Sequence, residues 1–167
     1  MSGAKTDRPG AAATIRPATA SDASWLLPLS ARLHDFGPPP WRPRADMDAA
    51  VARSIGEALE RPGADALVLV AEDPEGRPLG FVHLHSLTDY FTGEVHGHVS
   101  DIVVAAEAEG RGVGRSLMAA GEEWSRGRGH RVLTLNVFDE NSRARALYDR
   151  LGFSPDTLRM VKVLGPG

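Results

Sequence analysis

Three glycines stand at alternate positions immediately before a helix-forming stretch, in Glu109–Met118 (EGRGVGRSLM). Glycine lets the backbone turn tightly and approach another molecule closely. The first turn of a helix carries backbone N–H groups without intrahelical partners and a partial positive charge. A glycine-rich turn that leads into a helix is therefore suited to phosphate oxygens. The spacing excludes the dinucleotide-binding fingerprint, and the lack of a Gly-Lys-Ser/Thr ending excludes a P-loop.

Length and composition predict one domain. The chain has 167 residues, of which 42% are hydrophobic, and this suits a single core. We expect a disordered tail over residues 1–13 and one domain over residues 14–167. No segment approaches the roughly 18 apolar residues of a membrane span, and no apolar leader is visible, so we predict a cytoplasmic protein that does not bind membranes. The absence of cysteine excludes disulfides, and a net charge of -3 argues against a nucleic-acid partner.

Hydrophobic periodicity and turn residues predict an α/β (α+β) fold. The expected strands cover residues 14–16, 66–71, 79–87, 95–104, 132–138 and 158–163, and the expected helices cover residues 23–34, 46–60, the stretch from the glycine turn to about 126, and 142–151. The three strands between residues 66 and 104 most simply form an antiparallel meander.

Two blocks of this sequence resemble the GNAT superfamily of acetyltransferases. Val103–Leu117 is similar to that family's acyl-CoA-binding motif, and Asn141–Phe153 is similar to its late asparagine, tyrosine and glycine-phenylalanine signature. The order of elements agrees over residues 14–163. The resemblance implies a mixed, mostly antiparallel sheet of six to seven strands flanked by helices, with a splayed central strand pair. It also implies acetyl transfer from acetyl-CoA to a primary amine, by direct attack through a tetrahedral intermediate.

The family motif has Gln or Arg where this chain has Glu109. A carboxylate there would repel the pyrophosphate of CoA, so we expect Glu109 to point away and the backbone of residues 111–116 to make the contact. Asn141 also suits a helix N-cap. The resemblance implies that acetyl-CoA is bound by Ile102, Val103, Val104, Arg111, Gly112, Val113, Gly114, Arg115, Ser116, Asn136, Asn141 and Tyr148.

The same resemblance suggests the catalytic groups. Tyr148 would protonate the departing CoA thiolate, the alternative being a tyrosine that only packs in its helix. Gly97–Val104 is similar to the Glu-Asp strand of small-amine and amino-sugar acetyltransferases, with Ser100 in place of the glutamate. The strand period of two puts His98 on the face of Ser100, and Asp101 on the opposite face unless a bulge intervenes. Asp101 and His98 are both candidates for the general base. The resemblance favours Asp101, the alternative being that Asp101 is only structural.

Aromatic and histidine side chains are candidates for the acceptor site. The proline-rich loop contains Phe36 and Trp41, which can contact substrate or simply cover the core edge. His83, His85 and His96 are further candidates. With His98 they form two His-x-His pairs on neighbouring strands, which could hold zinc or nickel. We prefer a polar sheet face at the substrate cleft, and so predict no metal.

We therefore predict an N-acetyltransferase that binds acetyl-CoA and an amine acceptor. A small amine of the aminoglycoside or polyamine kind is preferred over a protein amine. A non-catalytic acyl-CoA sensor is the alternative, because its glycine turn would look the same. From the resemblance we also expect a homodimer.

Overall fold

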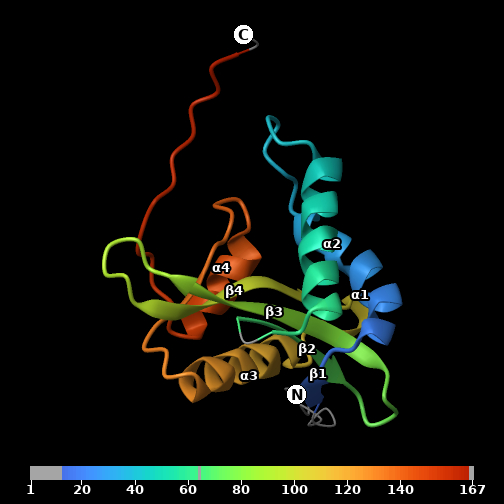
Figure 1. Ribbon diagram of the computed structural model, residues 1–167. Helices are drawn as coiled ribbons and strands as arrows, with labels where there is room; N and C mark the ends of the chain where they lie inside the picture. The colour runs from blue at the N-terminus through green and yellow to red at the C-terminus, as the bar shows by residue number, and fades with distance from the viewer. Residues whose placement is uncertain (1–12, 64, 166–167) are drawn as a thin grey trace, which may run out of the picture.

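The computed structural model describes residues 13–63 and 65–165 (Figure 1). The tail expected over residues 1–13 lies outside the described residues, apart from Ala13. None of the helices in the described ranges is both long and apolar enough to cross a membrane. The elements in chain order are β1 (Thr14–Pro17), the 3-10 helix η1 (Ala20–Asp22), α1 (Ala23–Ser30), the 3-10 helix η2 (Ala31–His34), α2 (Arg44–Glu60), β2 (Ala66–Glu72), β3 (Pro78–Thr88), β4 (Val95–Val104), the 3-10 helix η3 (Ala106–Ala108), α3 (Val113–Gly127), β5 (Leu133–Leu135) and α4 (Ser142–Arg150).

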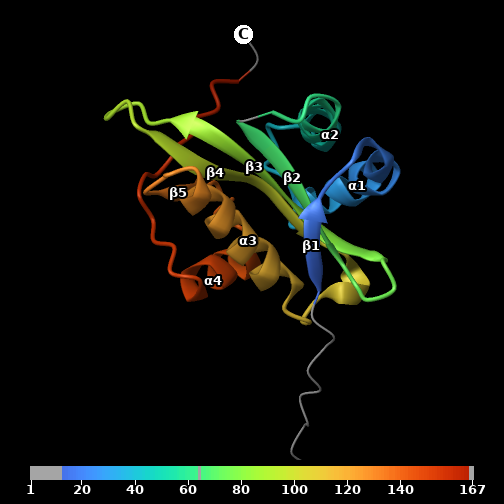
Figure 2. The same ribbon diagram turned by 60° about the horizontal axis from the view of Figure 1, so that its bottom comes forward.

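The strands form one sheet in the order β1-β2-β3-β4-β5. Neighbours from β1 to β4 are antiparallel, and β4 and β5 are parallel. Helices α1 and α2 cover one face of this sheet, and α3 and α4 lie on the other (Figure 2). The mixed, mostly antiparallel sheet flanked by helices that we expected is therefore confirmed.

Strand β2 shows how the sheet is buried from both sides. Val68 and Val70 belong to the apolar cluster under α1 and α2, which includes Ile55 of α2. Leu69 and Ala71 belong to the cluster under α3. A strand covered on both faces has a continuous apolar run instead of an alternating one. This is why ALVLVA has no polar residue.

The strand expected over residues 158–163 was wrong, and the sheet has five strands instead of six or seven. Among the described residues after Arg150 there is no helix or strand. Leu158 and Met160 are 82% and 85% exposed, and this segment runs away from the sheet (Figure 1). Alternating residues favour extended backbone, but a strand also needs a neighbouring edge to pair with. No edge in the described chain pairs with this segment.

Two other elements are shorter than expected. The strand predicted over residues 132–138 is limited to β5, because only Leu133–Leu135 pair with β4. The helix predicted over residues 23–34 ends as α1 at Ser30 and continues as η2.

Candidate active site

Strands β4 and β5 separate partway along their length. They pair at Gly97 with Leu133, His98 with Thr134 and Val99 with Leu135. From Ser100 to Val104, β4 continues without a β5 partner in the described chain. Backbone groups of this part of β4 that point toward β5 therefore have no strand partner. Ile102, Val103 and Val104, which we expected to contact acetyl-CoA, lie in this unpaired part.

A β-bulge at Ser100 decides which side chains share a face. In the β3–β4 pair, His83 is opposite Asp101, but the next residue of β3, Leu84, is opposite Val99. Ser100 is therefore the extra residue of β4. Residues directly opposite each other in an antiparallel pair lie on the same face. His83 and Asp101 consequently share one face with His85 and His98, which are also opposite each other. The bulge thus puts both candidate bases on the α2 side of the sheet.

Each of three histidines on this face has a polar neighbour at Nδ1. The Nδ1 atom of His83 is 3.1 Å from Asp101 Oδ2, that of His85 is 2.7 Å from Ser100 Oγ, and that of His98 is 2.8 Å from Thr134 Oγ1. His83 is fully buried, and its Nε2 has no hydrogen-bond partner among the described residues. His96 lies two residues before His98 on β4, opposite Leu87, and is half-buried. Over the described ranges, no three potential metal ligands converge on one point.

Burial keeps two of these imidazoles uncharged at neutral pH. Desolvation lowers the pKa of His85 below its ordinary value of 6.5, and nearby His83 lowers it further. Desolvation also lowers the pKa of His98, with smaller contributions from His96 and His85. Neutral imidazole can accept a proton, so this face is able to act as a base.

The glycine turn has the form that its sequence predicts. Gly110 and Gly112 have φ angles of 73° and 82°, in the left-handed region, and Gly112 is the N-cap of α3. The first i to i−4 hydrogen bond of the helix joins Ser116 N–H to Gly112 O at 3.1 Å. The backbone N–H groups of Val113, Gly114 and Arg115 precede this bond and have no intrahelical acceptor. With the exposed side chains of Arg111 and Arg115, they make this helix end attractive to anions.

Glu109 is neutralised by two arginines. Its carboxylate accepts a hydrogen bond from Arg32 at 2.8 Å and lies 2.8 Å from an Nη of Arg143. Hydrogen bonding to Arg143, followed by the charges of both arginines, holds the pKa of Glu109 below its usual range. The repulsion that we expected between Glu109 and a pyrophosphate is therefore offset by two guanidinium groups, which the sequence did not reveal.

Helix α4 meets the glycine turn and the end of β4. A Cβ placed on Gly114 would lie 3.6 Å from Val104 and 3.7 Å from Leu147. Asn141 caps α4 as expected, since its Oδ1 accepts a hydrogen bond from Ala144 N–H at 3.2 Å. Tyr148 packs edge-on against the ring of Phe153, with centroids 5.9 Å apart. Burial raises the pKa of Tyr148 to about 12.

The proline-rich loop contacts the segment that follows β5. The rings of Phe36 and Phe138 are 4.9 Å apart, and the Arg42 guanidinium lies 4.4 Å from the Trp41 ring. Trp41 is partly exposed, and Asn136 is exposed between β5 and Phe138. Phe36 and Trp41 thus sit where the chain leaves the splayed strands.

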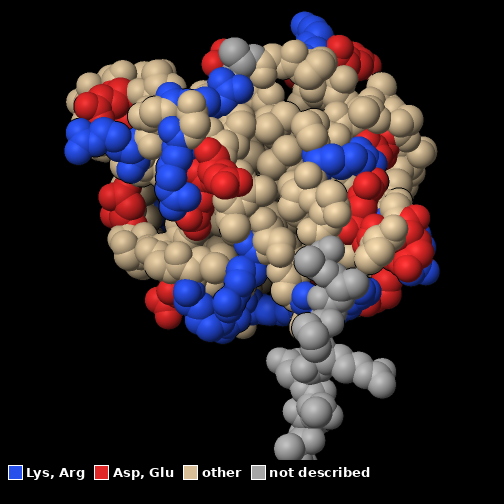
Figure 3. Space-filling model, turned by 90° about the horizontal axis from the view of Figure 1, so that it is seen from below, with Lys and Arg blue, Asp and Glu red and all other residues tan. Residues whose placement is uncertain are grey.

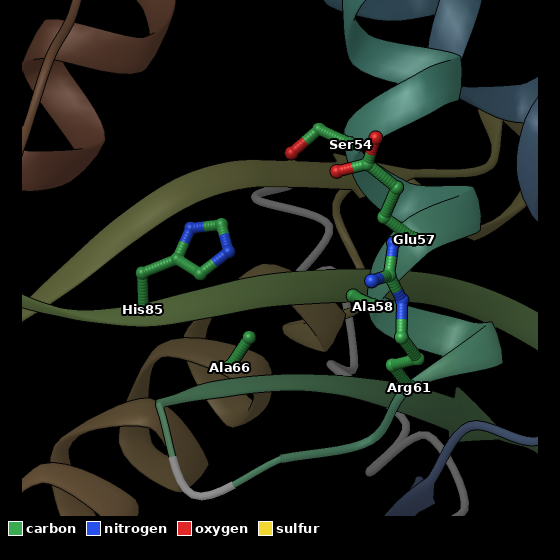
Figure 4. Close-up of a pocket in the computed structure, with 6 residues that line it drawn as sticks. All are labelled: Ser54, Glu57, Ala58, Arg61, Ala66 and His85. Carbon is green, nitrogen blue, oxygen red and sulfur yellow. The ribbon is translucent and has the colours of Figure 1, made fainter.

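A solvent-open cavity of about 340 Å³, whose lining includes the exposed side chains of Glu57 and Arg61, adjoins the histidine face, and our sequence reasoning missed most of it. Figure 4 shows side chains of α2 facing the ring of His85 across this space. The spacing of the α2 residues, i, i+3, i+4 and i+7, is the signal that could have identified them. The cavity is lined by Ser54, Glu57, Ala58, Arg61, Ala66 and His85.

Charges are mixed on the face that carries α3. Basic side chains there form separate groups among acidic and neutral ones (Figure 3). No single basic surface covers this face.

The chain is similar to known acetyltransferases over most of its length. The model of the acetyltransferase (GNAT) family matches residues 30–153. YhfO of Bacillus subtilis (strain 168), an uncharacterized N-acetyltransferase, is 29% identical over 143 residues, covering 86% of this chain and 91% of YhfO. Glucosamine 6-phosphate N-acetyltransferase 1 of Oryza sativa subsp. japonica is 34% identical over 155 residues, covering 90% of this chain and 87% of the relative.

A solved structure has the same fold. The enzyme AAC(6')-Iy, in complex with the bisubstrate analog CoA-S-monomethyl-acetylneamine, superimposes with a TM-score of 0.67 at 22% identity, covering 93% of this chain and 99% of AAC(6')-Iy. With the splayed strands, the bulge and the glycine turn, these similarities identify the chain as an acetyl-transferring enzyme of the GNAT family, which uses acetyl-CoA.

Proposed function

We propose that the enzyme acetylates a primary amine of a small molecule by direct attack of the amine on the thioester. The bulge at Ser100 carries this proposal, because it gathers proton-accepting side chains where β4 and β5 separate. The name of one similar enzyme, glucosamine 6-phosphate N-acetyltransferase 1, supports a small acceptor. The alternative of a non-catalytic sensor is set aside because the relatives are acetyltransferases.

The residues that would hold acetyl-CoA fit its chemistry. The N–H groups of Val113, Gly114 and Arg115, which have no acceptor within the helix, suit the pyrophosphate oxygens, and Arg111 adds positive charge. Backbone N–H groups of β4 after the bulge that point toward β5 have no strand partner in the described chain, and they suit a thioester carbonyl and the negative charge that develops on it. Bound acetyl-CoA supplies an activated acetyl group. No cysteine is available to take that group covalently.

The acceptor must lose a proton before or during attack. An alkyl amine has a pKa of about 10.4, so forming the neutral amine at pH 7 costs about 4 to 5 kcal/mol. We assign the role of base to His98, because its pKa is lowered and Thr134 occupies only its Nδ1. Asp101, oriented by His83, contributes negative charge that attracts the incoming ammonium group.

Tyr148 is our candidate for the group that donates a proton to the departing CoA thiolate. Burial raises the pKa of the phenol to about 12, which keeps it protonated in the physiological range and also makes it a weaker acid than an exposed tyrosine. A protonated phenol on α4 can donate to the departing thiolate. Leu147 lies next to Gly114, so α4 sits beside the glycine turn.

Acceptor-dependent release of CoA tests the proposal. Purified enzyme is given acetyl-CoA and a panel of small amines, and wild type is compared with His98→Ala, Asp101→Asn and Tyr148→Phe. We expect kcat of His98→Ala and Tyr148→Phe to fall by about 100- to 10,000-fold. His130→Ala, in the turn after α3, is the matched control. Failure to acetylate any amine would refute the proposed reaction, and full kcat of His98→Ala at every pH would refute the assigned base.

A further inference from the structure

One row of directly opposite residues runs across the strands of the sheet, from the cavity beside α2 to the proposed base His98. Ala66 of β2 is opposite His85 of β3, His85 is opposite His98 of β4, and His98 is opposite Thr134 of β5. Ala66 and His85 line the cavity, whereas His98 lies one residue before the last paired position of β4 and β5. Neighbouring strands are about 4.8 Å apart, so the cavity end of this row lies about 10 Å from His98.

Helix α2 brings two opposite charges to this cavity without pairing them. Glu57 and Arg61 both line it, and among the described residues neither side chain has a hydrogen bond or an ion pair. Figure 4 shows both projecting from the end of α2. The same Glu-x-x-x-Arg spacing does form an ion pair on α3, where Arg126 Nη2 lies 2.7 Å from Glu122 Oε2.

The position of Arg61 explains the difference. Arg126 is helical, but Arg61 is the C-cap of α2, with φ −129° and ψ 68°. Nonhelical backbone displaces its side chain from the i+4 position at which Glu and Arg normally meet. The guanidinium is therefore available to an anionic group in the cavity. Glu57 and Ser54 offer a carboxylate and a hydroxyl to polar groups beside it.

We propose that the acceptor is a small amine carrying a carboxylate or phosphate about 10 Å from the reacting nitrogen, and that Arg61 binds this anionic group. The amine then lies at His98, and the body of the molecule crosses His85. Ala58 and Ala66 leave room for it because their side chains are small. This inference rests on the proposed acetylation of a small amine and adds the charge and length of the acceptor.

Matched pairs of acceptors test the inference. One pair is glucosamine 6-phosphate and glucosamine, and the other is an ω-amino carboxylic acid and the alkylamine of equal length. We expect wild type to have the higher kcat/KM for the anionic member of at least one pair, and the preferred pair distinguishes phosphate from carboxylate. Arg61→Gln should raise KM for the preferred anionic acceptor by about 10- to 100-fold, as expected for a lost charged hydrogen bond. The same variant should leave KM for the neutral member of that pair unchanged.

Arg53→Gln is the matched control, because Arg53 is exposed on the same helix but does not line the cavity. Arg53→Gln removes the same charge and should leave KM for both acceptors of the pair unchanged. Thermal unfolding of each variant checks that α2 is intact. Equal use of both members of each pair by wild type, or an equal loss for both members in Arg61→Gln, would overturn the inference alone. No turnover with any amine would instead overturn the acetylation that it rests on.

Discussion

Near the bulge at Ser100, the two faces of the β3–β4 pair differ sharply in chemistry although they share one backbone. On the α3 side, Leu84 and Val99 face each other and are almost completely buried in an apolar cluster. On the α2 side, the residues next to the bulge are histidines and Asp101, whereas Phe81 and Val103 farther along the pair belong to the apolar cluster under α1 and α2. The apolar face supplies burial, and the polar face supplies groups that exchange protons. Stability and chemistry should therefore respond to different substitutions.

The largest effect on stability is expected on the apolar face. Leu84 is fully buried and touches α3 at Gly121. Leu84→Ala should lower the free energy of unfolding by about 2 to 5 kcal/mol, because it removes apolar contacts and leaves a cavity. Urea unfolding measures the change. Leu87→Ala, on the exposed end of the same strand, should cost much less, and equal losses would contradict the contrast between buried and exposed leucines.

A smaller effect is expected at the start of α3. Gly112 has positive φ, and a Cβ added there would meet no heavy atom within 4 Å beyond its chain neighbours. Gly112→Ala should therefore cost about 1 to 2 kcal/mol through backbone strain alone, and it should weaken acetyl-CoA binding by distorting the turn. Gly56→Ala is the matched variant within α2, where φ is not positive and space is open. It should stabilise the protein by about 0.5 to 1 kcal/mol, and a loss there as large as that at Gly112 would argue against strain as the cause.

The smallest effect is expected in the pH dependence of the free energy of unfolding, to which the histidine face should contribute and the apolar face should not. The pKa values of His85 and His98 are lower in the folded protein than the ordinary 6.5. Well above pH 6.5, these histidines are unprotonated in both the folded and the unfolded state. As the pH falls below 6.5 toward the folded pKa values, the unfolded chain binds protons that the folded protein does not, so stability decreases. His98→Gln should flatten this decrease between about pH 7 and pH 5.

Urea unfolding across that pH range measures the slope. Leu84→Ala should shift the whole stability curve downward without changing its slope, because no titrating group is altered. A slope in His98→Gln as steep as in wild type would show that burial of this histidine does not contribute to the pH dependence.

Local sequence patterns were sufficient for much of the fold. The apolar run of β2, the helical spacing of α2 and α3 and the glycine turn each depend on neighbours within a few residues. Asn141 was correctly predicted as a cap for the same reason. The prediction failed at residues 158–163, where alternation indicated a strand but no described edge pairs with it.

The sequence by itself determined the order of elements and the left-handed glycines at the start of α3, because backbone preferences act over short stretches of chain. Only the tertiary structure decided that His98 and Asp101 share a face, since the bulge at Ser100 depends on the register between β3 and β4. The same holds for the two arginines around Glu109, which come from η2 and α4. Contacts between distant segments have no local signature, and they determine which charges are paired and which remain available to a substrate.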